Sequence, residues 1–279
     1  MKQLLRYLFL TACCSCTGLF LAGQDAPDGS WYRQVTELRA QQRCDVALVL
    51  LDSVLSRQPG NRTAVYLAGA CYNQLNQPQK ALAVLETIRN LQSADYLLVF
   101  EKGNAFTRLG QTREALAAYE QVITWQPAFA GAYSARGDLM REQGQNTNDA
   151  LNWYVRALER DSLDSKNYYW AGWCSNDLGR FEQAATYLTK AAGQRSSFQA
   201  LAFAELGFSY YSLKNYQLAL DFLRKARNLQ EDLDVTRYYL GLCYVQMGDK
   251  QAAVREYNAL VLAKSSYAAT LLEQIKTMK

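Results

Sequence analysis

Small and large apolar residues recur along the chain at a fixed long spacing. Beginning at Ala47, an alanine returns every 34 or 35 residues, and a large apolar or aromatic residue follows each alanine four positions later. Residues four apart lie on one face of an α-helix, so each pair predicts an amphipathic helix. The pairs are Ala47 and Leu51, Ala81 and Leu85, Ala115 and Tyr119, Ala150 and Tyr154, Ala184 and Leu188, Ala219 and Leu223, and Ala253 and Tyr257.

Glycine returns with the same step, inside a second apolar segment that precedes each alanine, at Gly69, Gly103, Gly137, Gly172, Gly207 and Gly241. Glycine inside a helix costs about 1 kcal/mol relative to alanine, so we interpret these glycines as points where a neighbouring helix packs closely. The turn between the two segments carries residues that tolerate a left-handed backbone, namely Asn76, Gly110, Gly144, Gly179 and Gly248. Each period therefore predicts a helical hairpin of about 34 residues, which buries its apolar faces only when hairpins stack.

The hairpins resemble the tetratricopeptide repeat (TPR). Gly69-x-x-Tyr72 followed by Ala81 and Leu85 matches the family pattern, as do corresponding residues around Gly103, Gly207 and Gly241. The resemblance implies an all-α fold, a right-handed superhelical solenoid of seven helix-turn-helix TPR units plus a C-terminal capping helix over 268–279. The expected units are 28–61, 62–95, 96–129, 130–164, 165–199, 200–233 and 234–267.

The first 23 residues have the pattern of a targeting segment. Lys2 and Arg6 precede an uncharged apolar stretch, and a polar linker follows at 24–27. This pattern indicates a secretory signal peptide cleaved after Gly23, a lipoprotein signal acylated at Cys13, or an uncleaved membrane anchor. Each alternative predicts an exported protein, in the periplasm of a Gram-negative bacterium or attached to its cell envelope.

The amino-acid composition excludes several kinds of catalytic and binding site. The chain contains no histidine, which excludes His-based general bases, Ser-His-Asp systems and His-ligated metal sites. A formal net charge of +4 provides no strong field for nucleic acid. We therefore expect a protein that is not an enzyme, with no catalytic residues, no cofactor, no metal site and no nucleic-acid partner.

Four cysteines lie beyond the targeting segment, at Cys44, Cys71, Cys174 and Cys243. The last three share one position in their repeats, too far apart in a stack of hairpins for a disulfide. Only Cys44 and Cys71 lie in adjacent repeats. We expect all four to be small buried apolar side chains.

In the TPR family the first helix of each repeat lines a concave groove, and the resemblance implies that variable positions there meet a ligand. Aromatic rings, with amides between them, suit an extended peptide or a partner helix. We therefore expect a scaffold that binds a protein or peptide of unknown identity; the alternatives are a glycan-binding repeat protein of the cell envelope, or rings that only pack between helices. The candidate groove residues are Tyr66, Phe100, Asn104, Tyr169, Trp173, Asn176, Phe208, Tyr211 and Tyr238.

Overall fold

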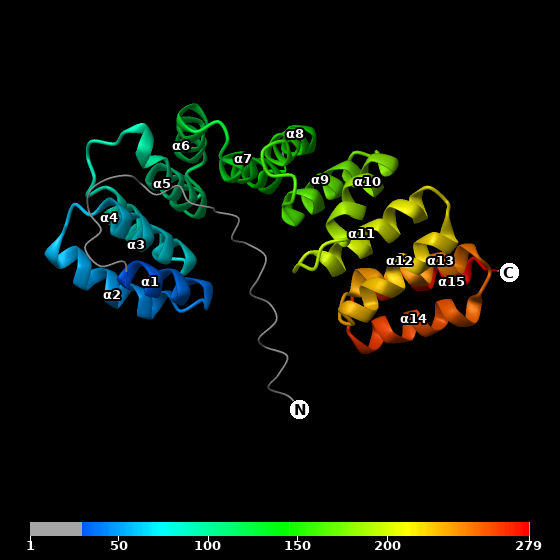
Figure 1. The fold of residues 1–279 in the computed structure, drawn as a ribbon. Coiled ribbons are helices and arrows are strands. Elements are labelled where there is room, and N and C mark those ends of the chain that lie inside the picture. Colours follow the sequence, from blue (N-terminus) through cyan, green and yellow to red (C-terminus); the bar gives the residue numbers. More distant parts are fainter. Residues whose placement is uncertain (1–29, 145, 279) are drawn as a thin grey trace. The chain divides into compact units, whose positions relative to one another are not determined.

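The computed structural model describes residues 30–144 and 146–278, and every regular element in these ranges is a helix (Figure 1). The chain divides into two compact units, Met1–Leu139 (unit 1) and Met140–Lys279 (unit 2). The predicted targeting segment, its linker and the candidate lipidation site at Cys13 lie outside the described residues. The predicted all-α fold is confirmed.

Unit 1 is built from consecutive helical hairpins, and each helix packs on the next one in the chain. In addition, α3 packs on α1 and on α5, so the odd-numbered helices of this unit form one row. α7 (Ala130–Glu142) contains the boundary between the units. The helices of unit 1 are α1 (Ser30–Ala40), α2 (Cys44–Arg57), α3 (Arg62–Gln74), α4 (Pro78–Leu85), α5 (Tyr96–Arg108) and α6 (Thr112–Trp125).

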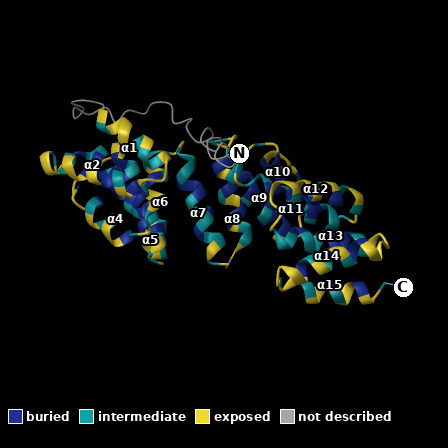
Figure 2. Cartoon of the chain, turned by 90° about the horizontal axis from the view of Figure 1, so that it is seen from below, coloured by how far each residue is buried: buried dark blue, intermediate teal, exposed yellow. Residues whose placement is uncertain are grey.

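Unit 2 repeats this arrangement, with contacts between consecutive helices and between α9, α11, α13 and α15 in turn. Buried and exposed residues alternate around each helix, as the pattern of amphipathic helices predicts (Figure 2). The helices are α8 (Thr147–Leu158), α9 (Ser165–Asp177), α10 (Phe181–Ala192), α11 (Gln199–Ser212), α12 (Tyr216–Leu229), α13 (Asp234–Gln246), α14 (Lys250–Leu262) and α15 (Tyr267–Lys276).

The recurring glycines make room for the recurring large side chains. A Cβ added to Gly69 would lie 2.6 Å from Leu85 Cδ2, and one added to Gly103 would lie 2.6 Å from Tyr119 Cε1. At Gly207 the added carbon would overlap the side chain of Leu223. The predicted close packing at glycine is therefore confirmed, and at Gly69, Gly103, Gly172 and Gly207 the partner is the large residue four positions after the alanine of the same hairpin.

Each hairpin turn contains one residue with a left-handed backbone. The predicted positions are confirmed, with φ values from 56° at Asn76 to 79° at Gly248. Gln42 and Lys214 occupy the same place in their hairpins with φ of 60°, although neither residue type indicates it. A residue with a Cβ costs about 1–2 kcal/mol in this conformation, so the hairpin geometry imposes it there.

One hairpin departs from the regular pattern, because α4 ends at Leu85 while its counterpart α6 runs for 14 residues. The chain after α4 is held in a non-helical path by Asp95, a buried carboxylate that accepts a hydrogen bond from the backbone N–H of Gln92 and pairs with Arg62. Arg62 also donates to the carbonyl of Asn90. These long-range bonds compete with continuation of the helix.

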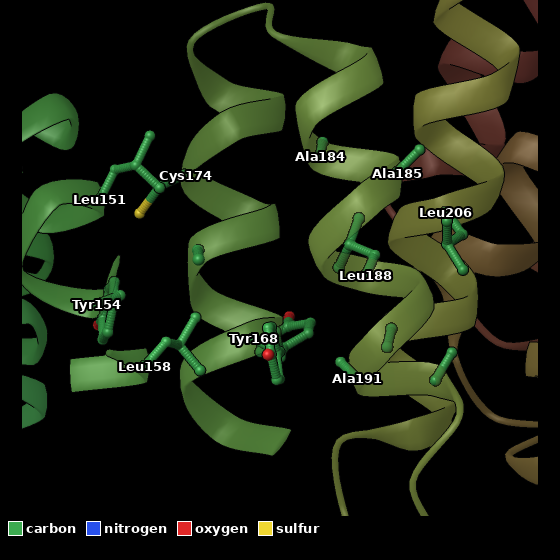
Figure 3. Close-up of a cluster of buried hydrophobic side chains, with 14 of the residues drawn as sticks. Leu151, Tyr154, Leu158, Tyr168, Cys174, Ala184, Ala185, Leu188, Ala191 and Leu206 are labelled. Atoms are coloured by element: carbon green, nitrogen blue, oxygen red, sulfur yellow. The ribbon is translucent and has the colours of Figure 1, made fainter. Parts of the chain in front are cut away.

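Apolar clusters fill the space between neighbouring hairpins. Figure 3 shows such a cluster in unit 2, where Cys174 and Tyr168 lie between side chains of α8 and α10. The four described cysteines form no disulfides and are fully buried, which confirms the prediction for their side chains. They are Cys44, Cys71, Cys174 and Cys243.

Two substitutions in one hairpin test these assignments. Gly207→Ala should lower the free energy of unfolding by about 1–3 kcal/mol, although alanine favours helix, because its methyl overlaps Leu223. Lys214→Gly should raise it by about 1 kcal/mol by relieving the left-handed backbone. Urea unfolding of both variants measures the difference, and a loss of stability in Lys214→Gly would contradict the explanation for the turn.

Candidate functional site

The predicted groove residues all lie on odd-numbered helices. In unit 1, Tyr66 lies on α3, and Phe100 and Asn104 lie on α5. In unit 2 the groove residues come from α9, α11 and α13. We call the surface formed by the odd-numbered helices of a unit the odd-helix face of that unit. The groove residues of unit 2 are Tyr169, Trp173, Asn176, Phe208, Tyr211 and Tyr238.

Burial separates these residues into two kinds. Tyr169 and Asn176 are only 6% and 5% exposed, so their side chains face other helices rather than solvent. The remaining seven candidates are half-buried. Their role in binding stays a prediction, and the half-buried rings are the ones with surface to offer a partner.

A polar cluster lies beneath the odd-helix face of unit 1 and joins three consecutive hairpins. Asn73 Nδ2 on α3 donates to the Glu101 carboxylate on α5 at 2.8 Å and to the Glu101 carbonyl at 2.9 Å. Arg39 on α1 lies close enough to Tyr66 on α3 for its charge to act on the pKa of the tyrosine hydroxyl. The charges of Arg39 and Glu101 both act on Tyr66, so these four residues form one electrostatic unit.

Unit 2 contains the same four residue types at the same hairpin positions. Asn176 Nδ2 on α9 donates to the Glu205 carboxylate on α11 at 2.9 Å and to the Glu205 carbonyl at 3.2 Å. The charges of Arg141 and Glu205 both act on Tyr169. The guanidinium of Arg141 also lies 3.9 Å from the ring centre of Trp170, a cation–π contact.

The polar clusters of units 1 and 2, which we call the twin clusters, can be recognised from the sequence. A comparison of each repeat with the next one misses them, because their shared pattern returns only after three repeats. The pattern Y-x-A-G-x-C-x-N-x-L occurs at 66–75 and again at 169–178, three repeats later. The arginines and the glutamates of the two clusters are also three repeats apart. A comparison of each repeat with the third one after it would have found them.

The two clusters differ in one hydroxyl group. In unit 2 the Ser209 hydroxyl donates to Asn176 Oδ1 at 2.7 Å, which completes the bonding of that amide. In unit 1 the corresponding residue is Ala105, and Asn73 Oδ1 is buried without a hydrogen-bond partner. An unsatisfied buried acceptor costs about 1–3 kcal/mol, so the cluster of unit 1 is the less stable one.

Burial controls the protonation of the clusters. It raises the pKa of Glu101, while hydrogen bonds from Asn73 and Asn104 and the charge of Arg39 act in the opposite direction. It likewise raises the pKa of Glu205, against the hydrogen bond from Asn176. Burial, followed by the charge of Glu205, raises the pKa of Tyr239 to about 12, so this hydroxyl is neutral at physiological pH.

In unit 2, aromatic rings on α11, α13 and α15 contact one another. The ring centre of Tyr239 lies 5.0 Å from that of Phe208, 5.9 Å from Tyr211 and 5.2 Å from Tyr238, and Tyr238 stacks on Tyr267 at 4.9 Å. We call these five residues the aromatic row. Because each ring rests on the next, the row is held in place before any partner arrives.

The other aromatic candidates pack more locally. Trp173 lies edge-on to Trp170 at 5.9 Å, and Phe100 lies edge-on to Phe129 at 5.0 Å. Within residues 30–144 and 146–278, no cluster of three or more Cys, Asp or Glu side chains is suited to a metal ion. No helix of these ranges is both long and apolar enough to cross a bilayer.

Sequence profiles of the tetratricopeptide repeat match residues 38–96, 176–232 and 236–263, and a TPR repeat profile matches 103–144. Together these matches cover more than half of the chain. The chain belongs to the tetratricopeptide repeat family. No curated protein matches this TPR chain.

Solved structures of TPR proteins share its fold. The C-terminal part of a TPR repeat-containing protein from Cytophaga hutchinsonii is 15% identical, with a TM-score of 0.62 over 86% of this chain and 99% of that one. MamA is 20% identical, with a TM-score of 0.56 over 61% of this chain and 91% of its own. YrrB, described as a TPR protein with an unusual peptide-binding site, is 20% identical, with a TM-score of 0.53 over 67% and 95%.

The hydroxyl of Ser209 in unit 2, which Ala105 lacks in unit 1, can be tested by a matched pair of substitutions. Ser209→Ala should lower the free energy of unfolding by about 1–3 kcal/mol, because it leaves Asn176 Oδ1 buried and unpaired. Ala105→Ser should raise it by about 1 kcal/mol, because the new hydroxyl can donate to Asn73 Oδ1. Thermal and urea unfolding measure both changes; destabilisation by Ala105→Ser would show that the two clusters are not equivalent.

The raised carboxyl pKa predicts a pH dependence. Because the folded-state pKa of Glu205 lies above its ordinary value of 4.5, this group makes folding less favourable at neutral pH, and the penalty fades as the pH falls through the folded pKa. Glu205→Gln should therefore stabilise the protein at about pH 7, with an advantage that shrinks towards about pH 4.5. Urea unfolding across this range tests it, and a difference that stays constant with pH would refute the assignment.

Proposed function

We propose that this TPR protein is a non-enzymatic scaffold that binds an extended peptide or a partner helix along the odd-helix face. The observation that carries the proposal is the aromatic row of unit 2. Four of its five rings are half-buried, Tyr267 is exposed, and the rings are in contact with one another. Such rings give a partner large contact area at little cost in side-chain entropy.

The polar cluster of unit 2 involves the same helix as the first rings of the row. Asn176 ties α9 to α11 through Glu205, next to the first rings of the row. Glu205 lies on α11 one turn before Phe208 of the row, and its charge adds to burial in raising the pKa of Tyr239. A bound peptide would therefore meet a surface whose helix spacing is set in advance, which lowers the cost of ordering on binding.

The chemistry of the surface indicates the kind of partner. The row offers apolar ring surface and neutral hydroxyls, with Tyr267 38% exposed at its α15 end. A peptide with apolar anchors and free backbone amides fits such a surface better than a highly charged one. YrrB, a TPR protein with a similar fold, has a peptide-binding site by description, which supports this class of partner.

We also propose that the protein acts outside the cytoplasm. The proposal rests on the basic start, the apolar stretch and the polar linker within residues 1–27. Intact-mass measurement of the native protein should show a chain that lacks residues 1–23 or that begins at a lipidated Cys13. A full-length unmodified chain in the cytoplasm would exclude export.

Photo-crosslinking in cells tests the binding surface. A photoreactive phenylalanine analogue at Tyr238 should capture a protein partner, whereas the same analogue at Tyr187, an aromatic position on the even-numbered helix α10, should not. Tyr238→Ala with Tyr267→Ala should weaken binding of that partner at least about tenfold with little change in melting temperature.

Other outcomes of this experiment are equally informative. Capture at Tyr187 alone would place the binding surface on the even-numbered helices. Binding of a soluble oligosaccharide with no protein captured at either position would support the glycan-binding alternative. A large drop in melting temperature in the double variant would show that the rings are packing residues.

A further inference from the structure

Two thiols meet where the first described hairpin packs on the second. Cys44 begins α2 and Cys71 lies in α3, and both are 0% exposed in one apolar cluster with Ala47 and Leu67. The Cys44 thiol donates to Gln74 Oε1 at 3.1 Å. After burial, Cys44 is the next influence that raises the pKa of Cys71, as expected of two thiols packed in the same cluster.

The repeat register explains why this pair is special among the described cysteines. At the corresponding joint of unit 2, Thr147 takes the place of Cys44, and its hydroxyl donates to Asp177 as Cys44 donates to Gln74. Cys174, the counterpart of Cys71, therefore has a threonine opposite it. At the joint before Cys243 the corresponding residue is Tyr216.

We propose that Cys44 and Cys71 are a site of oxidation and form a disulfide between α2 and α3 when the protein meets a disulfide oxidant. One thiol loses its proton and attacks the oxidant's disulfide, which releases one oxidant sulfur as a thiol. The second thiol then attacks the protein sulfur of this mixed disulfide, which releases the other oxidant sulfur. The protein loses two protons and two electrons, and the oxidant becomes two thiols.

Burial sets the rate of this reaction rather than its outcome. Burial is the main cause that raises the pKa of Cys71 to about 12. Little thiolate is therefore present while the first hairpin is packed on the second. Oxidation therefore proceeds when the first hairpin opens from the second. Once formed, the bond closes the loop 45–70 and holds α2 against α3, which suits a protein exposed to an oxidising compartment.

Peptide mapping of the full chain tests the proposal. After the native protein is equilibrated with oxidised glutathione, trypsin should yield peptide 44–57 linked to peptide 63–80, with a mass two hydrogens below the sum of the free peptides. Cys71→Ser should abolish the link. Amide hydrogen exchange in α2 should slow at least about tenfold on oxidation, because the hairpin can no longer open freely.

Thr147→Cys is the matched control, because it recreates the pair at the equivalent joint. It should form a second link, between peptides 142–156 and 167–180, through Cys174. The proposal is overturned if the native protein carries only glutathione adducts or free thiols at 44 and 71. It is also overturned if the 147–174 link forms while the 44–71 link does not.

Discussion

The fold depends on one contact that recurs in four hairpins, between a glycine of the first helix and a large side chain of the second. Leu85, Tyr119, Leu188 and Leu223 each occupy the space that a glycine leaves. This contact sets the distance between the two helices, and it leaves the opposite side of the first helix available. The helix propensity lost at glycine, about 1 kcal/mol per site, is offset by burial of a large apolar side chain.

A contact of the same kind, between a glycine and a leucine, occurs at α15. Gly241 receives Leu271 from α15 in the place where other hairpins use their own second helix. The aromatic row ends on this element through Tyr267. The packing that covers the last hairpin and the surface proposed to bind a partner therefore meet in a single short helix.

Sequence alone predicted the features that repeat with each hairpin, and missed those that arise between hairpins. The left-handed turns at Gly110 and Gly179 follow from residue type, whereas Lys214 adopts the same backbone only because its hairpin requires it. The irregular path after the short α4 contains the pair of Arg62 and Asp95, which lie 33 positions apart and so escape a local pattern. Likewise, the register of Tyr169 and Asn176 predicted that they line a groove, but both side chains are buried. Asn176 bonds to Glu205 of α11, and the ring of Phe198 packs against Tyr169.

The twin clusters give this chain a second, longer period. The pattern at 66–75 returns at 169–178, with an arginine and a glutamate in matching places, so the chain repeats itself every three hairpins as well as every hairpin. The two copies differ where Ser209 supplies a hydroxyl to Asn176, because Asn73 lacks that partner. Each cluster is therefore an internal reference for the other, in which the effect of one hydroxyl is displayed within a single molecule.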